Sequence, residues 1–324
     1  RDGQFGEQAD REMRLVLDLQ TIRLLRHQPG AVLVQCDLVR PDRKPVGQSP
    51  RAILRQQLKI AEGRGYHVLA STELEFMIFH NSYEDARNAH YRDLAAASPD
   101  HAEYSIVAGS RIEPLLRTIR NTVYAAGIDI RTIKARRHPG QHSISLGYQD
   151  ALATADDHAV FKTIAKEIAA QHGKSITFMA SCDEQQGNAC RVRLSLQSDR
   201  GSAEFWSEGE RTRLYDTFVA GLLATLDDFT LLYAPNINSY KRLGTDDRAA
   251  LVSRLADDST TSVENRLPGA DVNPYLALAA MIAGGLHGID HDLELGPAST
   301  RSAGSTGLKR IPHTLRAARQ AFQR

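Results

Sequence analysis

Two stretches of the chain alternate charged with apolar residues, and this alternation limits what the chain can fold into more than any other feature. The first, residues 72–79, carries Glu73 and Glu75 between apolar neighbours, and the second carries Arg191 and Arg193 in the same way. Because successive residues of a β-strand point to opposite faces of a sheet, each stretch is predicted to be a strand with one apolar and one charged face. If the charged faces meet, two glutamates lie opposite several arginines.

A basic segment ends in a tight turn and leads into a third strand. Lys134, Arg136 and Arg137 stand shortly before Pro139-Gly140, a pair that is typical of turns. After the turn, apolar residues alternate with Ser and Gly over residues 144–148, which predicts a strand. The turn would bring further positive charge towards the glutamates.

The nearly neutral net charge argues against partners that bind through long-range electrostatic attraction. Of 324 residues, 40 are Lys or Arg and 39 are Asp or Glu, which gives a formal net charge of +1. We therefore expect neither nucleic acid nor a membrane surface as a partner. The length favours one large domain with a smaller one over a single compact unit.

The cysteines and the longest apolar run indicate where the protein works. Cys36, Cys182 and Cys190 are too few and too irregularly spaced for a disulfide framework or a zinc site, which favours a reducing, cytoplasmic location. Residues 275–289 form the longest apolar run, which is shorter than the roughly 20 residues that span a bilayer. This run is predicted to be a buried helix. Because the chain starts at Arg1, we also expect a preceding N-terminal part.

Local signals predict strands and helices separated by long loops. Strands are expected at residues 13–25, 31–38, 72–79, 128–133, 144–148, 175–179 and 190–196. Helices are expected from Ser49-Pro50 to Gly63, from a capping box of Ser110 and Glu113 to Gly127, from Asp150 to His172, from about Gly209 to Tyr233, and from Asn273-Pro274 onwards. Together they favour an α+β architecture, in which helices back a curved, largely antiparallel sheet. Residues 296–307, rich in Ser, Gly and Thr, are predicted to be mobile.

Five motifs, which follow one another in a fixed order, carry a resemblance to a known family. They are Glu73-Leu74-Glu75-Phe76, Pro139-Gly140-Gln141-His142, the segment 166–175, the segment 235–242 (Pro-Asn-Ile-Asn-Ser-Tyr-Lys-Arg) and the segment 264–271 (Glu-Asn-Arg-Leu-Pro-Gly-Ala-Asp). In this combination the chain resembles the glutamine synthetase superfamily from about residue 12 to 315. The likeness is greatest to the actinobacterial branch that joins glutamate to small amines or polyamines.

The resemblance implies a fold, an assembly and a reaction. Residues 1–46 would be the last part of an N-terminal β-grasp domain, and residues 47–324 a catalytic domain with a half-barrel of strands. The family forms dodecamers of two stacked hexameric rings, with active sites between neighbours, so a homo-oligomer or a ring shared with a homologue is implied. ATP phosphorylates the γ-carboxylate of glutamate, an amine displaces the phosphate, and two divalent ions neutralise charge.

Half of the positions that hold the two ions in the family carry other residues in this chain. The positions for one ion are Glu73, Glu264 and Arg191, and those for the other are Glu75, Arg136 and Ser143. Arg193 stands where the family has a second histidine, on the nucleotide side. Hard oxygen ligands and histidine are therefore replaced by permanent cations, which argues against bound magnesium.

The residues that grip the substrate in the family are better kept. Arg242 matches the arginine for the substrate α-carboxylate, and Arg266 and Arg248 match arginines for substrate and phosphates. Ser262 replaces a further arginine. The longer flap with a catalytic glutamate, which the family carries after Arg242, does not occur in this sequence.

Three functions fit these observations. In the first, the protein is a repurposed enzyme in which Arg136, Arg191 and Glu75 take part in catalysis, as an amide ligase or in acyl or γ-glutamyl transfer to an amine. In the second, it is an inactive relative that keeps the fold as a scaffold or as a binder of metabolites or partners. In the third, it is an ordinary ATP-dependent glutamate–amine ligase that uses magnesium.

Overall fold

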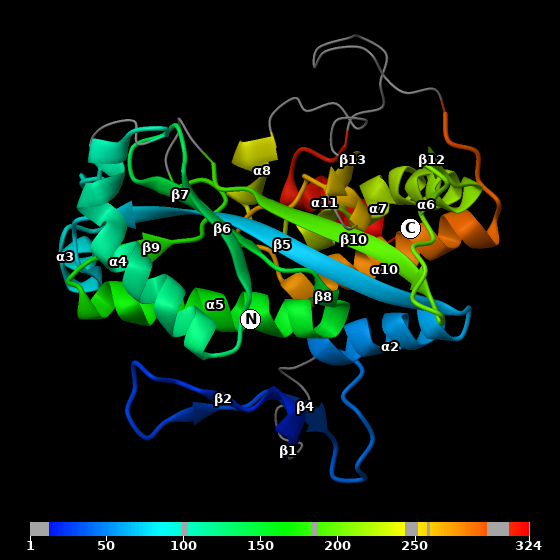
Figure 1. The fold of residues 1–324 in the computed structure, drawn as a ribbon, viewed down its shortest axis with the longest axis horizontal. Coiled ribbons are helices and arrows are strands. Elements are labelled where there is room, and N and C mark those ends of the chain that lie inside the picture. Colours follow the sequence, from blue (N-terminus) through cyan, green and yellow to red (C-terminus); the bar gives the residue numbers. More distant parts are fainter. Residues whose placement is uncertain are drawn as a thin grey trace.

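The long strand β5, Tyr66–Phe79, crosses the whole molecule and forms its centre (Figure 1). The computed structural model describes residues 13–98, 103–182, 187–243, 252–257, 260–296 and 311–323. β5 belongs to an eight-stranded sheet with the order β13-β14-β10-β5-β7-β6, in which β8 and β9 also pair with β5. All pairs in this sheet are antiparallel, which confirms the predicted α+β class.

The other strands of the sheet are short and come from distant parts of the chain. They are β6 (Ile130–Ala135), β7 (Gln141–Leu146), β8 (Gln149–Asp150), β9 (Ser175–Thr177), β10 (Cys190–Ser198), β13 (Val252–Asp257) and β14 (Thr260–Asn265). The predicted strand at 144–148 thus lies earlier, at β7. The register places Glu73 between Arg191 of β10 and Ser145 of β7, and Glu75 opposite Ser143. The charged faces of β5 and β10 therefore meet, as predicted.

Helices cover the opposite face of the sheet. α2 (Pro50–Glu62), α5 (Ala151–Gln171) and α10 (Pro274–Asp290) lie together on this side (Figure 1). The remaining helices are α3 (Tyr83–Asn88), α4 (Ile106–Ala125), α6 (Arg213–Ala224), α7 (Leu226–Tyr233), α8 (Ser239–Leu243) and α11 (Leu315–Phe322). α10 is buried along most of its length, which confirms the buried helix predicted for the longest apolar run. No helix within the described ranges is long and apolar enough to cross a membrane.

The core lies between the sheet and these helices. Leu74, Phe76 and Ile78 of β5 are buried on the helix side, and Phe76 packs against Phe161 of α5 and against Phe178. Since alternate residues face opposite sides, Glu73 and Glu75 point away from the helices. Because the apolar residues of β5 face the helices, its glutamates must lie on the opposite face of the sheet.

Two predicted helices differ from those in the structure, each for a local reason. α4 begins four residues before the expected capping box, because Ser105 is the N-cap and accepts a hydrogen bond from the amide of Ala108 (3.2 Å). Ser110 lies inside the helix and donates to the carbonyl of Val107 instead (2.8 Å). The helix expected over residues 209–233 is two helices, since the chain breaks at Thr225, which bonds back to a carbonyl in α6.

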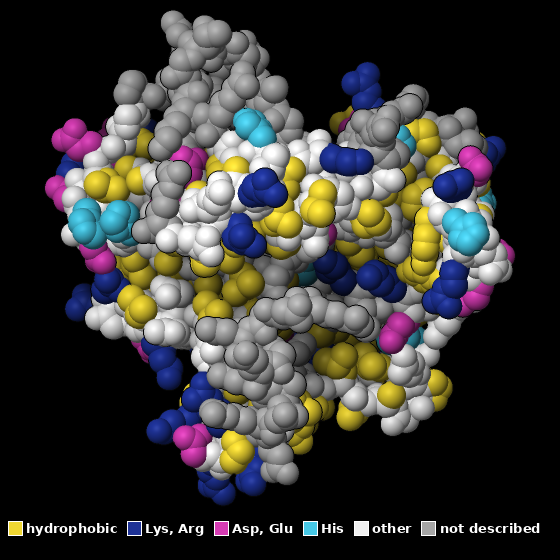
Figure 2. All heavy atoms as spheres, turned by 180° about the vertical axis from the view of Figure 1, so that it is seen from behind, with side chains coloured by type: hydrophobic (Ala, Val, Ile, Leu, Met, Phe, Trp, Pro, Cys, Tyr) yellow, Lys and Arg dark blue, Asp and Glu magenta, His cyan; other side chains and the backbone are white. Residues whose placement is uncertain are grey.

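The segment before α2 is built from short pieces. It contains β1 (Arg14–Leu17), the 3-10 helix η1 (Leu19–Thr21), β2 (Arg23–Leu24), β3 (Val32–Leu33) and β4 (Cys36–Val39). The single strand predicted over residues 13–25 is wrong, because the carboxylate of Asp18 caps η1 and ends β1. Several apolar side chains of this segment lie on the surface (Figure 2). Of the tail predicted to be mobile, residues 297–307 lie outside the described residues.

Candidate functional site

Arg193 joins two glutamates from different strands. Its Nη2 lies 2.8 Å from Glu73 Oε2, and its Nε donates to Glu264 Oε2 at 2.8 Å. Two further arginines stand beside this bridge. Arg266 Nε donates to Glu264 Oε1 at 2.6 Å, while Arg191 Nη1 lies 3.8 Å from Glu73 Oε2. One guanidinium group thus occupies the space between two carboxylates.

Glu75 forms a separate ion pair, with Arg136. Arg136 Nη2 lies 3.0 Å from Glu75 Oε1, and the amide of Ala189 donates to Glu75 Oε2 at 2.8 Å. Arg136 is fixed by the hairpin between β6 and β7, because its amide donates to the carbonyl of Gln141. The hairpin requires a glycine at position 140, where φ is +72° and a Cβ would lie 2.7 Å from the carbonyl oxygen of Ile78.

The balance of charge at the site is positive. Three carboxylates face four guanidinium groups, so that one positive charge remains in excess. Glu264 is 1% exposed. Its burial alone would raise its pKa, but the hydrogen bonds and charges of Arg266 and Arg193 outweigh burial, and the pKa is lowered. Burial would likewise lower the pKa of Arg193, yet Glu264 and Glu73 raise it. Glu264 therefore stays ionised although it is buried.

Hydroxyl groups lie next to the Arg193 bridge. The hydroxyl of Tyr148 donates to Ser262 Oγ at 2.6 Å, and Ser262 is buried on β14. Burial raises the pKa of Tyr148, so that it stays a neutral hydrogen-bond donor. The sequence pattern assigned Tyr148 to an apolar strand face, but β7 ends at Leu146 and the chain then turns Tyr148 towards β14. Its role at the site was therefore missed.

The predicted substrate-binding arginines are described to different extents. Arg266 is partly exposed beside Glu264. Arg242 belongs to α8, but its side chain lies outside the described part of the structure, as does all of Arg248. Asp271 holds the start of α8: its Oδ2 accepts from Ser239 Oγ at 2.7 Å and from Asn236 Nδ2 at 2.9 Å. Sequence reasoning did not single out Asp271, although it ends one of the five motifs.

Comparison with known proteins decides the family. Residues 47–324 match the catalytic domain of glutamine synthetase. The chain belongs to the glutamine synthetase family. It is similar to γ-glutamylethanolamide synthetase GlnA4 of Streptomyces coelicolor, with 42% identity over 318 residues that cover 94% of this chain and 69% of the relative. It is also similar to glutamate–isopropylamine ligase of a Pseudomonas species, with 34% identity over 302 residues, 87% of this chain and 65% of the relative.

Solved structures share the fold. The ligand-free structure of GmaS superposes with a TM-score of 0.85 and 26% identity, over 97% of this chain and 76% of that one. A complex of GmaS with ADP gives the same TM-score at 25% identity and covers 96% of this chain and 76% of the other. The catalytic fold expected from the five motifs is thereby confirmed.

In the described part of the structure, the carboxylates at the family's metal positions are paired with arginines and do not form a site for a divalent ion. A hard ion needs several oxygen ligands that converge on one point. In the described ranges, no group of three or more His, Cys, Asp or Glu side chains has the arrangement of a metal site. The oxygens of Glu73, Glu75 and Glu264 that would bind an ion are instead paired with guanidinium groups at 2.6 to 3.0 Å. A cation would have to displace a permanent cation from each carboxylate.

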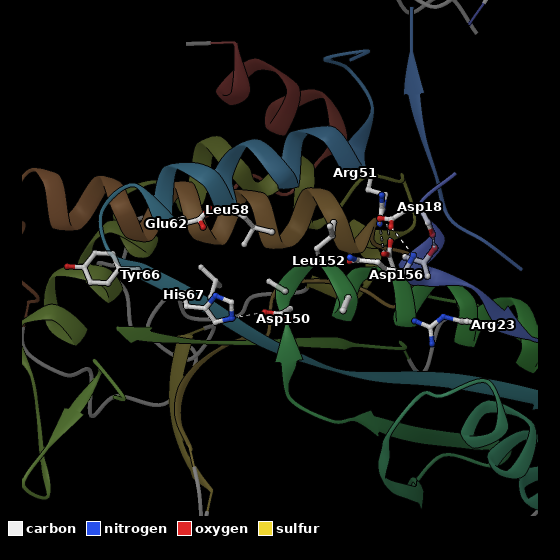
Figure 3. A pocket seen from close by; sticks show the side chains of 15 residues that line it. Asp18, Arg23, Arg51, Leu58, Glu62, Tyr66, His67, Asp150, Leu152 and Asp156 are labelled. Carbon is white, nitrogen blue, oxygen red and sulfur yellow. Dashed lines mark hydrogen bonds and ion pairs between the residues drawn. The ribbon is translucent and has the colours of Figure 1, made fainter. Parts of the chain in front are cut away.

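Two further hollows lie away from this site. Figure 3 shows one of about 400 Å³ between η1, α2 and α5, where buried Arg51 contacts Asp18, Asp37 and Asp156 at 2.7 to 2.9 Å. This cluster attaches the N-terminal segment to the catalytic domain. The other, about 650 Å³, lies between α8 and α11 and carries basic side chains, among them Lys241. Neither contains a side chain of the arginine and glutamate site.

Proposed function

We propose that the protein joins the γ-carboxylate of glutamate, or of a glutamate-like acid, to a small primary amine. A carboxylate is a poor electrophile, so the reaction requires an activated acid. In the proposed sequence, an oxygen of the γ-carboxylate attacks the terminal phosphorus of ATP and ADP leaves. The amine nitrogen then attacks the acyl carbon, the bond to the phosphate oxygen breaks, and the nitrogen loses its proton to water.

The similar proteins support this substrate class. Two relatives, at 42% and 34% identity, are named for the ligation of glutamate to ethanolamine and to isopropylamine. A third, at 30% identity, is γ-glutamylputrescine synthetase of Escherichia coli. The ADP complex of GmaS supports a nucleotide as the phosphoryl donor. A product assay with several amines tests which of them this protein takes.

Arginines of the site are the proposed binding groups for the acid. Arg266 uses its Nε to hold Glu264, which leaves its terminal nitrogens for a carboxylate of the substrate. Arg242 and Arg248 are assigned to the same task through the family motif. Asp271 would position Arg242, because it holds the loop that leads into α8.

The charge that metal ions neutralise in other family members falls, in this proposal, to guanidinium groups. Arg191 and Arg136 flank the carboxylates of β5, and Arg193 lies between Glu73 and Glu264 on the nucleotide side. Fixed cations in a partly buried site stabilise developing negative charge on phosphoryl and acyl oxygens. Glu75 orients Arg136 for this task. Catalysis would then need no bound magnesium.

The assembly and the organisation of the chain remain proposals from the family resemblance. These are a division into a β-grasp part at residues 1–46 and a catalytic part at 47–324, a ring-shaped oligomer such as a dodecamer, and a cytoplasmic location. Size-exclusion chromatography with light scattering on the purified chain tests the oligomer, since a dodecamer has twelve times the mass of one chain.

One observation favours a second candidate, an inactive member of the family that binds a metabolite or a partner. Glu73, Glu75 and Glu264 each accept a guanidinium hydrogen bond or ion pair at 3.0 Å or less. Paired with guanidinium groups in this way, these three carboxylates are poor acceptors for the proton that the amine must lose. The same arginine network that replaces the metals would then hold the site closed to chemistry.

A product assay separates the candidates. The purified chain is incubated with ATP, glutamate and ethanolamine, isopropylamine or ammonia, in magnesium or in EDTA, and γ-glutamyl amide is measured by mass spectrometry alongside released phosphate. Product in EDTA supports the arginine-run ligase, and product only in magnesium supports an ordinary one. Arg266→Gln should abolish product. Arg213→Gln, which changes an exposed arginine at the start of α6, should not. Absence of product with every amine refutes the proposed ligase and favours the second candidate.

A further inference from the structure

Three arginines of the site use only part of their hydrogen-bonding capacity. Arg193 makes two contacts at 2.8 Å and its side chain is 18% exposed. Arg191 has its nearest carboxylate at 3.8 Å and is 31% exposed, and Arg136 has one ion pair at 3.0 Å and is 28% exposed. A guanidinium group carries five N–H donors in a planar fork. Within the described ranges, most donors of Arg191 and Arg136 therefore remain available to a ligand.

The sheet brings these two groups to the same face. Arg191 lies beside Glu73 and Arg136 beside Glu75, two residues further along β5. Glu73 and Glu75 are alternate residues of one strand, so both point to the same face of the sheet. Arg191 approaches from β10, on one side of β5, and Arg136 from the hairpin on the other side. The two forks thus lie on the charged face of the sheet, one on each side of β5, so that a ligand that contacts both must carry more than one anionic group.

The charge of this surface selects an anion. Besides the one excess guanidinium group, Lys134 on β6 lies opposite Ser143, next to Glu75. Ser143 and Ser145 add short hydroxyl side chains where carboxylates would repel an anion. Forked pairing of arginine with phosphate is strong and needs no bridging metal.

We propose that Arg191 and Arg136 bind the linked phosphates of a polyphosphate directly, without a divalent cation. The choice of a nucleotide as the natural source rests on the function proposed above, but the binding itself does not. Where other members of the family would take up a nucleotide with metal ions, this chain takes it up with guanidinium groups. Added magnesium competes with the protein for the same phosphate oxygens.

Titration calorimetry with inorganic tripolyphosphate tests this proposal. In EDTA the probe should bind, and an excess of magnesium should leave the affinity unchanged or lower it. Arg191→Gln and Arg136→Gln should each weaken binding by about tenfold or more, as expected for loss of a charge-assisted hydrogen bond. The matched control is Arg131→Gln, since Arg131 lies on β6 near Arg136 but is 67% exposed and paired with Asp129. Binding that appears only with magnesium, or that survives both substitutions, overturns the proposal.

A second ligand and a second variant show whether the two arginines bind phosphate or carboxylate groups. Glutarate, a dicarboxylate, is titrated in parallel, and tighter binding of glutarate than of tripolyphosphate would assign the two arginines to the acid instead. Arg191→Lys keeps the charge beside Glu73 but removes the fork, so it should fold like the parent chain and still bind more weakly. Polyphosphate binding without any amide product would leave this inference standing while the proposed ligase fails. Amide formation by a chain that binds no polyphosphate in EDTA would overturn this inference and leave the proposed ligase standing.

Discussion

Replacing Arg193 by methionine removes the guanidinium group that joins β5 to β14 through Glu73 and Glu264. Methionine keeps a long, unbranched side chain and adds no new charge, so the change is confined to the ion pairs. Glu73 is 8% exposed and Glu264 is 1% exposed. Both carboxylates therefore lose a partner in surroundings where water cannot take its place.

The expected loss follows from the contacts that remain. Breaking a buried ion pair by removing one partner costs about 3 to 5 kcal/mol. Glu264 keeps Arg266 at 2.6 Å, and Glu73 keeps Arg191, which starts at 3.8 Å and can move closer. We therefore expect the lower end, about 3 kcal/mol. With an unfolding entropy of about 2.1 cal/mol/K for each residue of the chain, this lowers the melting midpoint by about 4 to 5 °C.

The dependence on pH distinguishes an ion pair from simple packing. The pKa of Glu264 is lowered in the folded protein, so its pair with Arg193 stabilises the fold above the ordinary pKa of glutamate. This contribution is lost as the pH falls through the lowered pKa. Urea unfolding of Arg193→Met and of the parent chain should thus differ most at pH 7 and less at pH 4. A difference below about 1 kcal/mol at pH 7, or one that persists unchanged at pH 4, would refute the reasoning.

Other changes test the metal positions and the packing. Arg191→His combined with Arg136→Glu and Ser143→Glu should create measurable magnesium binding in titration calorimetry, and no gain would contradict the assignment of these positions to metal ligands. Arg51→Met should destabilise the chain by about 3 kcal/mol in urea, since it leaves buried Asp156 without its ionic partner, whereas Asp18 and Asp37 keep Arg55. Gly288→Ala should cost about 1 to 3 kcal/mol or more in the same assay, because its Cβ would lie 2.0 Å from a carbonyl oxygen of α6; an unchanged midpoint would show that α6 and α10 shift apart freely.

The sheet and its charged face could be predicted because the relevant signals are local. The alternation around Glu73 and Glu75 reports which side of β5 is buried, and that side faces α5 as expected. The turn at Pro139-Gly140 also followed from residue type, since position 140 has a positive φ and no space for a side chain. Signals of this kind depend on a few neighbouring residues and survive the details of packing.

The parts that could not be predicted depend on contacts between distant residues. Sequence reasoning placed Arg191 at a metal-ligand position and Arg193 at the second histidine position of the same strand, and it did not predict which of them bridges the glutamates. In the structure Arg193 contacts both Glu73 and Glu264 at 2.8 Å, whereas Arg191 lies 3.8 Å from Glu73. The choice between the two depends on the register of β10 against β5 and β14, which alternation alone does not fix. Tyr148 was missed for the same reason, since its partner Ser262 is 114 residues away.

The glutamates that remain at this site are explained without any metal. Removing Arg193 leaves Glu73 and Glu264 buried with fewer partners, and removing either glutamate leaves Arg193 with one acceptor instead of two. The pairs thus stabilise the sheet whether or not the protein catalyses a reaction. Their presence is therefore no argument for magnesium-dependent chemistry, and the case for a working site rests on groups that this mutual pairing leaves unsatisfied. Arg191, Arg136 and the outer nitrogens of Arg266 are such groups, so experiments on these three side chains, rather than on the glutamates, decide between a ligase and an inactive relative.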